Sequence, residues 1–169
     1  MGLKDSLPEE TGKTLTENAI QKAEAGVELT KKVSIADDTG LEVDALNGFP
    51  GVYSARFAGP SGNYKANRKK LLELLNSLPI EQRKARFRCI VAIAGTSGEP
   101  TRVFEGKVEG YITQEEKGTY GFGYDSVFLI PDIGKTFAEI PPRLKNEISH
   151  RTLALLKLKE YLKSKYLNV

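Results

Sequence analysis

The first periodicity in the chain is a set of apolar residues at helical spacing. Four of them stand four positions apart: Leu15, Ala19, Ala23 and Val27. This spacing predicts a helix that buries one face. Thr14 has the side chain of an N-cap, and Glu17, three residues later, completes a capping-box pattern. We expect the helix to end within residues 26–29 and a short apolar strand to follow over residues 33–36.

Later patterns predict a second helix, a strand pair and a C-terminal helix. Residues 64–78 carry an apolar face formed by Leu71, Leu72, Leu74, Leu75 and Leu78. The apolar run FRCIVAIA has the length of a strand, and residues 101–112 form the next one. The turn-forming run from Ser97 to Pro100 is expected to join them as a hairpin. The last helix follows Ser149, with an apolar face at Leu153, Leu156, Leu158, Tyr161 and Leu162.

This order of elements predicts the α/β fold class, with a mixed, twisted central sheet flanked by helices. A chain of 169 residues is long enough to bury a core, and we expect a single domain over residues 1–169. Hydrophobic residues make up 40% of the chain and charged residues 28%. This composition is typical of a globular protein and argues against a disordered one.

Charge and hydropathy argue against two classes of partner. The net charge of +3 is too small to predict nucleic-acid binding. No apolar run approaches the roughly 20 residues of a membrane span, and the initial run MGLKDSLPEE lacks the apolar segment of a signal peptide. The single cysteine, Cys89, excludes an internal disulfide and lies in an apolar run that favours an inert, buried thiol. We therefore expect a cytoplasmic protein that binds neither nucleic acid nor membrane.

Carboxylates gather where the strand after the first helix is expected to end. Asp37, Asp38, Glu42 and Asp44 stand within eight residues and repel one another. They form either a solvated acidic turn or a site that shares a cation, and carboxylates with room for water suit Mg²⁺. The glycine- and proline-rich run over residues 47–59 favours the cation site, because a solvated turn needs few special backbone positions.

Two side-chain directions matter for such a site. Consecutive strand residues point to opposite faces of a sheet, so Asp37 and Asp38 can converge only where the chain turns. Thr39 and Gly40 follow directly and are expected to supply that turn. Lys22 lies off the apolar stripe of the first helix, where a solvated lysine is the usual outcome.

Two further motifs lie late in the chain. Residues 118–125, GTYGFGYD, form a glycine-rich run without the Gly-Lys-Ser/Thr ending of a Walker loop. This run predicts either a hairpin turn or a loop whose backbone approaches a ligand closely. His150, the only histidine, and Arg151 stand in the first turn of the last helix, with Lys145 upstream. Because cations are disfavoured at a helix N-terminus, their presence favours contact with an anion or an electron-rich acceptor over a packing role.

Four motifs together resemble a known family. ADDTGLEVDALNGFPGVYSARFAG is similar to the signature of the inosine triphosphate pyrophosphatase family, and FGYDSVF, GKTFAEI and KNEISHRTLAL match it in the same order. The resemblance extends from about Glu9 to about Tyr161. It implies two lobes with a substrate cleft between them, a homodimer, and nucleotide-pool cleansing. The implied reaction is the Mg²⁺-dependent hydrolysis of noncanonical purine nucleoside triphosphates (ITP, dITP, XTP) to the monophosphate and pyrophosphate.

The resemblance assigns the metal and phosphate contacts to the first half of the chain. It implies that Asp38 and Glu10 hold Mg²⁺, with Asp37 as a further ligand. Asp38 also resembles the proton acceptor for the water that attacks the phosphorus nearest the sugar. Lys22 resembles a phosphate contact, and Thr39 stands at a substrate-contacting position where serine is more usual.

Base recognition is assigned to the second half. Phe122 is expected to stack on the base, within a binding loop that continues through Gly123, Tyr124 and Asp125. Polar contacts are implied for Asp125, Lys145, His150 and Arg151. Donors on Arg151 or His150 satisfy the 6-oxygen of hypoxanthine or xanthine but stay unpaired against the amino group of adenine, which gives strong discrimination.

The sequence departs from the family pattern at its start. Family members typically begin with a strand and a Thr/Ser-x-Asn-x-x-Lys loop that grips the triphosphate. The present sequence begins after that point, roughly 30 to 40 residues short of a typical single-domain member. An alternative is therefore a nucleotide-binding domain with impaired catalysis. A hydrolase of non-standard pyrimidine nucleotides is a third option, against which the SHR and FGYD motifs speak.

Overall fold

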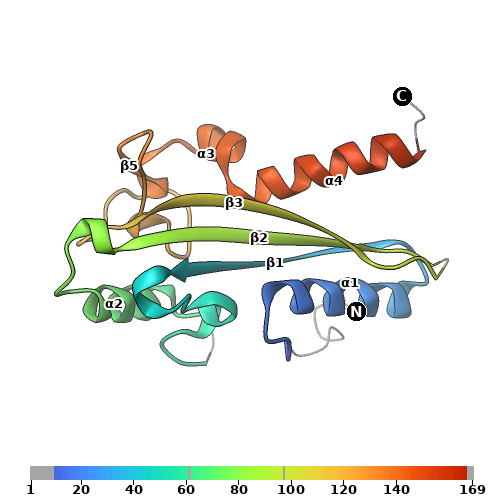
Figure 1. Cartoon of the computed structure of the whole chain (residues 1–169), viewed down its shortest axis with the longest axis horizontal. Coiled ribbons are helices and arrows are strands. Elements are labelled where there is room, and N and C mark those ends of the chain that lie inside the picture. The colour runs from blue at the N-terminus through green and yellow to red at the C-terminus, as the bar shows by residue number, and fades with distance from the viewer. Residues whose placement is uncertain (1–9, 61, 97, 167–169) are drawn as a thin grey trace. The chain divides into compact units, whose positions relative to one another are not determined.

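A five-stranded sheet and four α-helices account for most of the described chain. The computed structural model describes residues 10–60, 62–96 and 98–166 (Figure 1). The helices are α1 (Leu15–Thr30), α2 (Tyr64–Leu74), α3 (Pro142–Ile148) and α4 (His150–Tyr166). The strands are β1 (Ser34–Val43), β2 (Lys84–Ala94), β3 (Arg102–Ile112), β4 (Phe128–Ile130) and β5 (Lys135–Thr136). They neighbour one another in chain order, and β4 pairs antiparallel with both β3 and β5. The predicted α/β class, a sheet flanked by helices, is confirmed.

Short 3-10 helices connect several of these elements. They are η2 (Asp44–Leu46), η3 (Gly51–Arg56), η4 (Ile80–Gln82), η5 (Asp125–Val127) and η6 (Phe137–Glu139).

The predicted pairing of β2 with β3 is also found. Ser97, expected in the turn between these two strands, lies outside the described residues.

The N-terminus of α1 is capped nearly as predicted. The hydroxyl of Thr14 accepts a hydrogen bond from the backbone N–H of Glu17 at 3.1 Å. The carboxylate of Glu17 accepts from the N–H of Lys13 at 2.6 Å, one residue earlier than in the expected capping box. The helix ends at Thr30, where Lys31 adopts a left-handed conformation with φ of 57°.

Strand β1 is longer than expected, and the predicted Thr39-Gly40 turn is wrong. The strand continues through Asp37, Asp38, Thr39 and Gly40 and ends only at Val43. Leu41 and Val43 are fully buried, so the core holds the chain extended beyond the carboxylates. Asp37 and Asp38 are therefore consecutive residues of a continuous strand, and their side chains point to opposite faces.

The chain forms two compact units, each assembled from separate segments. The first unit comprises Met1–Thr39, Cys89–Gly106 and His150–Val169. The second comprises Gly40–Arg88 and Lys107–Ser149. Strands β1, β2 and β3 each contribute residues to both units. The expected cleft between two lobes stays a prediction.

In the first unit, α1 and α4 lie on opposite sides of the strands (Figure 1). The core beneath α4 contains Cys89, Val91 and Ile93 from β2, together with Ala154 and Leu158 from the helix. Leu158, Tyr161 and Leu162 face this core as predicted. Leu153 and Leu156 do not, because they are 36% and 48% exposed, so this part of the predicted apolar face is wrong.

The residues of α4 that are buried are determined by their position on the helix, not by their hydrophobicity. His150, Ala154 and Leu158 recur every four residues and are all buried. Gly106 of β3 allows the start of the helix to approach closely, because a Cβ atom there would lie 2.0 Å from the carbonyl oxygen of His150. Gly106 on the strand and Ala154 on the helix thus determine which face of α4 packs against β3.

The second unit has a larger apolar core. Leu71 and Leu75 are fully buried beside Phe87, Phe128 and Phe137. Helix α2 ends at Leu74 rather than at residue 78 as predicted. The buried guanidinium of Arg83 donates to the carbonyl oxygens of Leu75 and Leu78, just beyond this early end. It also donates to the carbonyl oxygen of Thr113, which follows β3.

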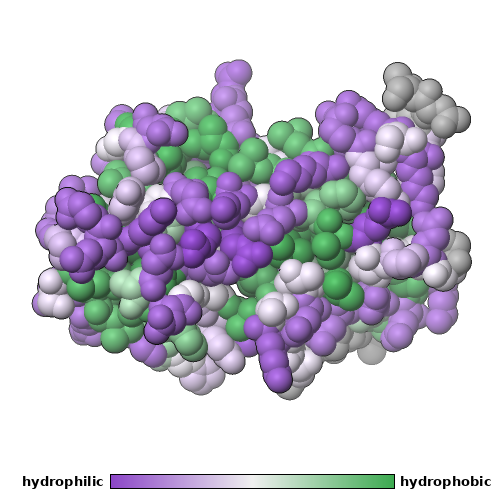
Figure 2. Space-filling view, viewed as in Figure 1, coloured by the Kyte–Doolittle hydropathy of each residue, from purple (hydrophilic) through white to green (hydrophobic). Residues whose placement is uncertain are grey.

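Hydrophilic side chains interleave with smaller hydrophobic areas on the face shown in Figure 2. Within the described ranges, no helix has the length and apolar character that a membrane span requires.

Candidate active site

A lysine of α1 joins two carboxylates in the first unit. The ammonium nitrogen of Lys22 lies 2.8 Å from Oδ1 of Asp38 and 3.1 Å from Oε1 of Glu10. Asp38 comes from β1, whereas Glu10 precedes α1. The structure thus brings together three of the residues that the sequence proposed for the metal and phosphates. Lys22 does not have the solvated position that its place on the helix first suggested.

Asn18 holds the other oxygen of Asp38, and sequence reasoning missed it. Its amide nitrogen donates to Oδ2 of Asp38 at 3.2 Å, and its Oδ1 accepts from the N–H of Gly12 at 2.8 Å. Asn18 is completely buried. A polar residue next to the apolar stripe of α1 was the available signal, because a buried amide requires partners.

Burial and the contacts with Lys22 shift the pKa of Asp38 in opposite directions, and burial and the two carboxylates do so at Lys22. Burial raises the pKa of Asp38, and the nearby Glu10 carboxylate acts in the same direction. Hydrogen bonds from Lys22 and Asn18 oppose this effect without cancelling it. At Lys22 burial lowers the pKa, but Asp38 and Glu10 outweigh burial, so the pKa is raised and the ammonium stays charged. One cation therefore serves two carboxylates.

Asp37 faces a different set of partners. Its Oδ2 accepts from Nη2 of Arg151 at 3.0 Å and from Nε of the same guanidinium at 3.2 Å. The hydroxyl of Thr39 donates to the same oxygen at 3.3 Å, and the thiol of Cys89 lies 3.7 Å away. The structure therefore places Asp37 with Arg151 and Thr39, not with Glu10 and Asp38.

His150 opens α4 and is only 6% exposed. Its neighbour Arg151 is more exposed, with 43% of its side chain accessible. Arg151 therefore combines a carboxylate partner, Asp37, with access to solvent.

The glycine-rich loop in the second unit is organised by Asp125. This residue is 3% exposed, and its Oδ2 accepts from the N–H of Phe122 at 2.7 Å and from the ammonium of Lys145. Gly121 has φ of +78°, and a Cβ atom there would lie 2.0 Å from Oδ2 of Asp125. Only glycine fits at this position.

Phe122 presents its ring at the surface of this loop. It is 63% exposed, and the ammonium of Lys145 lies 4.8 Å from the ring centroid. Tyr124, expected to contact substrate, is 2% exposed and donates its hydroxyl to the carbonyl oxygen of Ser54 at 2.8 Å. Burial raises the pKa of this phenol. Tyr124 therefore anchors the loop, while Phe122 offers a flat apolar surface.

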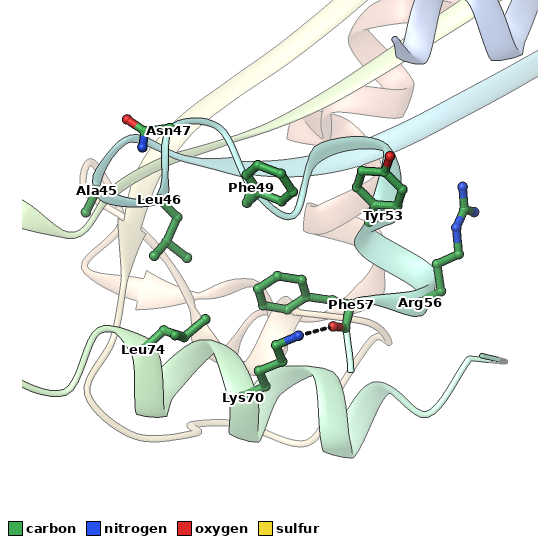
Figure 3. Close-up of a pocket in the computed structure, with 9 residues that line it drawn as sticks. All are labelled: Ala45, Leu46, Asn47, Phe49, Tyr53, Arg56, Phe57, Lys70 and Leu74. Atoms are coloured by element: carbon green, nitrogen blue, oxygen red, sulfur yellow. Dashed lines mark hydrogen bonds between the residues drawn. The ribbon is translucent and has the colours of Figure 1, made fainter. Parts of the chain in front are cut away.

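Two hollows lie in the second unit, and one of them borders the glycine-rich loop. One of about 150 Å³ is lined by the glycine-rich loop together with Arg68 and Glu116. The other, of about 650 Å³, gathers the apolar side chains of Leu46, Phe49, Tyr53, Phe57 and Leu74 (Figure 3). Lys70 closes one side of it by donating to the carbonyl oxygen of Phe57 (Figure 3). None of its lining residues is acidic, so the larger hollow lacks the ligands that a magnesium site requires.

Glu10 and Asp38 suit a divalent cation. Mg²⁺ commonly uses one or two carboxylates, keeps several waters and adds phosphate oxygens from the substrate. Across the described ranges, no three His, Cys, Asp or Glu side chains gather closely enough for an all-protein metal cluster. The two carboxylates already share one cation, the Lys22 ammonium, which demonstrates that their charges converge.

Comparison with known proteins decides the family. The model of the Ham1 family matches residues 2–161. The chain belongs to the Ham1 family. A Ham1 protein of Staphylococcus aureus has a similar structure, with a TM-score of 0.88 and 44% sequence identity. The similarity covers 93% of the present chain and 80% of the other.

Relatives within the Ham1 family carry a functional name. The dITP/XTP pyrophosphatase of Bacillus subtilis (strain 168) is 52% identical over 156 residues, which span 92% of this chain and 78% of the relative. The dITP/XTP pyrophosphatase of Bacillus licheniformis is 55% identical over 154 residues, which span 91% and 78% of the two chains. The family resemblance noted from the four motifs is confirmed.

Proposed function

We propose that this chain hydrolyses noncanonical purine nucleoside triphosphates, among them dITP, XTP and ITP, to the monophosphate and pyrophosphate. The observation that carries this function is the 52% and 55% identity to two dITP/XTP pyrophosphatases over about nine tenths of the chain. The cluster of Asp38, Glu10 and Lys22 supports it, because phosphoryl transfer depends on positioned carboxylates and cations.

Asp38 is the proposed proton acceptor. A water oxygen attacks the phosphorus nearest the sugar, the bond from that phosphorus to the bridging oxygen breaks, and pyrophosphate leaves. The proton of the water passes to Asp38, whose raised pKa suits it to accept a proton better than an ordinary aspartate. Asn18 keeps the carboxylate oriented during this step.

Glu10 and Asp38 are the residues that would hold Mg²⁺, and Asp37 is the further ligand proposed from the sequence. The ion, when bound, neutralises charge that develops on the phosphates. Lys22 is the proposed phosphate contact beside it, and Thr39 a further substrate contact.

The base is assigned to two groups of residues. Phe122 supplies the stacking surface, on a loop shaped by Gly123, Tyr124 and the Asp125–Lys145 pair. Arg151, held by Asp37, donates to the 6-oxygen of hypoxanthine or xanthine, and His150 supports the same contact. Such a donor is left unpaired against adenine, which carries an amino group instead.

A homodimer in the cytoplasm is the proposed state of the protein, following the family resemblance. Light scattering coupled to size-exclusion chromatography would measure the mass of the assembly, and a mass of one chain at micromolar concentration would exclude the dimer.

The first experiment measures pyrophosphate release, with Mg²⁺, from inosine, xanthosine, adenosine and guanosine triphosphates. The Asp38→Asn variant, purified in parallel, reports contaminating phosphatases. Release from the inosine and xanthosine substrates alone, absent in the variant, is the expected result. A chain that binds these nucleotides without releasing pyrophosphate would instead be the catalytically impaired binding domain.

A further inference from the structure

The glycine-rich loop is fastened from α2 by an arginine that has no assigned role. Arg68 Nη1 donates to the carbonyl oxygen of Gly123 at 2.8 Å. Its Nε donates to Oε2 of Glu116, also at 2.8 Å. Only 19% of the Arg68 side chain is exposed. One planar guanidinium therefore makes two charge-assisted hydrogen bonds in a fixed geometry.

Glu116 connects Arg68 to the other end of the loop, at Ser126. The same Oε2 accepts from the hydroxyl of Ser126 at 2.9 Å. The backbone closes the base of the loop, because the N–H of Lys117 donates to the carbonyl oxygen of Ser126 at 2.8 Å. Arg68 and Glu116 thus hold the loop on one side, whereas Lys145 and Asp125 hold it on the other.

A loop of this composition needs such fastening. Gly121 and Gly123 both have positive φ, and glycine has more conformational freedom to lose than any other residue. Phe122 stands between them with an exposed ring. If the loop were unrestrained, a ligand that stacks on this ring would have to order the glycines at a cost in affinity.

We propose that Arg68 is a positioning residue for base recognition. It fixes the Gly123 carbonyl, and through Glu116 the Ser126 end, so that the ring of Phe122 is ready before the nucleotide arrives. This inference rests on the proposed function of the loop. It gives Arg68 no part in the chemical step, because the guanidinium donates to the loop and to Glu116.

The first test follows the loop without any nucleotide. Amide hydrogen exchange over residues 117–126 is compared in the parent chain, Arg68→Ala, Glu116→Gln and Lys69→Ala. Lys69 is the matched control, because it neighbours Arg68 on α2 and pairs with Glu73 on the same helix. We expect exchange about tenfold faster in Arg68→Ala, less acceleration in Glu116→Gln, and none in Lys69→Ala. Unchanged exchange in both loop variants overturns the proposal.

The second test separates positioning from general damage. With inosine triphosphate, Arg68→Ala should raise KM about tenfold and leave kcat within about twofold, because only the ordering of the loop is affected. Arg68→Lys should recover part of the loss, since it keeps the charge but not the two-point geometry. A fall in kcat at constant KM overturns the proposal.

The two tests keep the two hypotheses apart. If the parent chain releases no pyrophosphate, the proposed function fails, and the dissociation constant for inosine monophosphate replaces KM. If the parent does not bind this nucleotide either, the exchange measurement alone decides whether Arg68 orders the loop. Should Arg68→Ala fail to fold, Glu116→Gln breaks the same bridge and leaves α2 intact.

Discussion

The ammonium nitrogen of Lys22 lies 2.8 Å from Oδ1 of Asp38. Glu10 approaches the same ammonium at 3.1 Å, so one positive charge is shared by both of the proposed metal ligands. A divalent cation that binds these carboxylates must compete with this charge. If Glu10 and Asp38 hold the metal as proposed, Lys22 should weaken metal binding in the nucleotide-free protein and become available to another anion once it is displaced.

The Lys22→Met variant should therefore bind Mn²⁺ roughly tenfold more tightly than the parent when no nucleotide is present, because removal of a nearby like charge favours the cation. Calorimetry or the paramagnetic resonance of free Mn²⁺ measures this affinity. Lys163→Met is the control, since Lys163 pairs with Glu160 on the surface of α4. Equal affinities in Lys22→Met and the parent would mean that the metal binds elsewhere.

The Asp38→Asn variant should lose turnover by about 10²–10⁴-fold, the usual contribution of a general base. Nucleotide affinity measured without Mg²⁺ should change little, because the amide keeps the shape of the side chain and can still accept from Asn18. Single-turnover kinetics and nucleotide binding separate the two effects. If Asp37→Asn loses as much turnover and Asp38→Asn does not, the base has been assigned to the wrong residue.

Arg151→Ala should narrow the preference for inosine over adenosine nucleotides. The ratio of kcat/KM for the two triphosphates measures this preference. Asp37→Asn should shift the ratio in the same direction but less, because Asp37 accepts from both Nε and Nη2 of Arg151 and keeps the guanidinium in place. An unaltered ratio in both variants assigns base discrimination to other residues.

Gly106→Ala should destabilise the first unit by about 1–3 kcal/mol, the usual cost of overpacking. The added methyl group meets the backbone of α4, 2.0 Å from the carbonyl oxygen of His150 and 2.4 Å from the nitrogen of Ala154. Gly26→Ala is a milder comparison, because its methyl group meets the Cβ and Oγ atoms of Ser34, both at 2.9 Å, and no backbone atom is among these contacts. The alanine also gains helix propensity. Denaturant unfolding compares the two, and similar midpoints would contradict the close strand–helix contact.

Cys89 should be unreactive in the folded protein near neutral pH. Burial raises the pKa of its thiol to about 11, so almost no thiolate is present near neutral pH. An aromatic disulfide reagent should therefore label no thiol at pH 8 and one thiol after unfolding in denaturant. The raised pKa also affects stability. The contribution of the neutral thiol to the free energy of unfolding is present at pH 8 and lost as the pH rises through about 11. Rapid labelling of the native protein would show that β2 opens.

Local sequence signals predicted the elements whose ends are decided locally. Thr14 caps α1, the apolar run of β2 forms a strand, and α4 begins directly after Ser149. The end of β1 was mispredicted because Leu41 and Val43, which are buried against distant residues, keep the strand extended past Thr39 and Gly40. Tertiary packing overrode the turn propensity there.

Sequence motifs likewise identified some of the candidate site residues and missed others. Motifs identified Asp38, Lys22 and Phe122, because these residue types have recognisable chemistry at recognisable spacing. Asn18 and Arg68 escaped notice, since their partners Asp38 and Gly123 lie 20 and 55 positions away along the chain. A polar residue that orients another acquires its meaning only from the folded contact.

The two sides of the Phe122 ring are not equivalent, because the ammonium of Lys145 covers one of them. A planar ligand can approach only from the other side. Proteins that bind single-stranded nucleic acids arrange several rings so that successive bases continue one stack. A ring with a single open side can stack on only one base. This loop therefore favours a mononucleotide over a single-stranded nucleic acid.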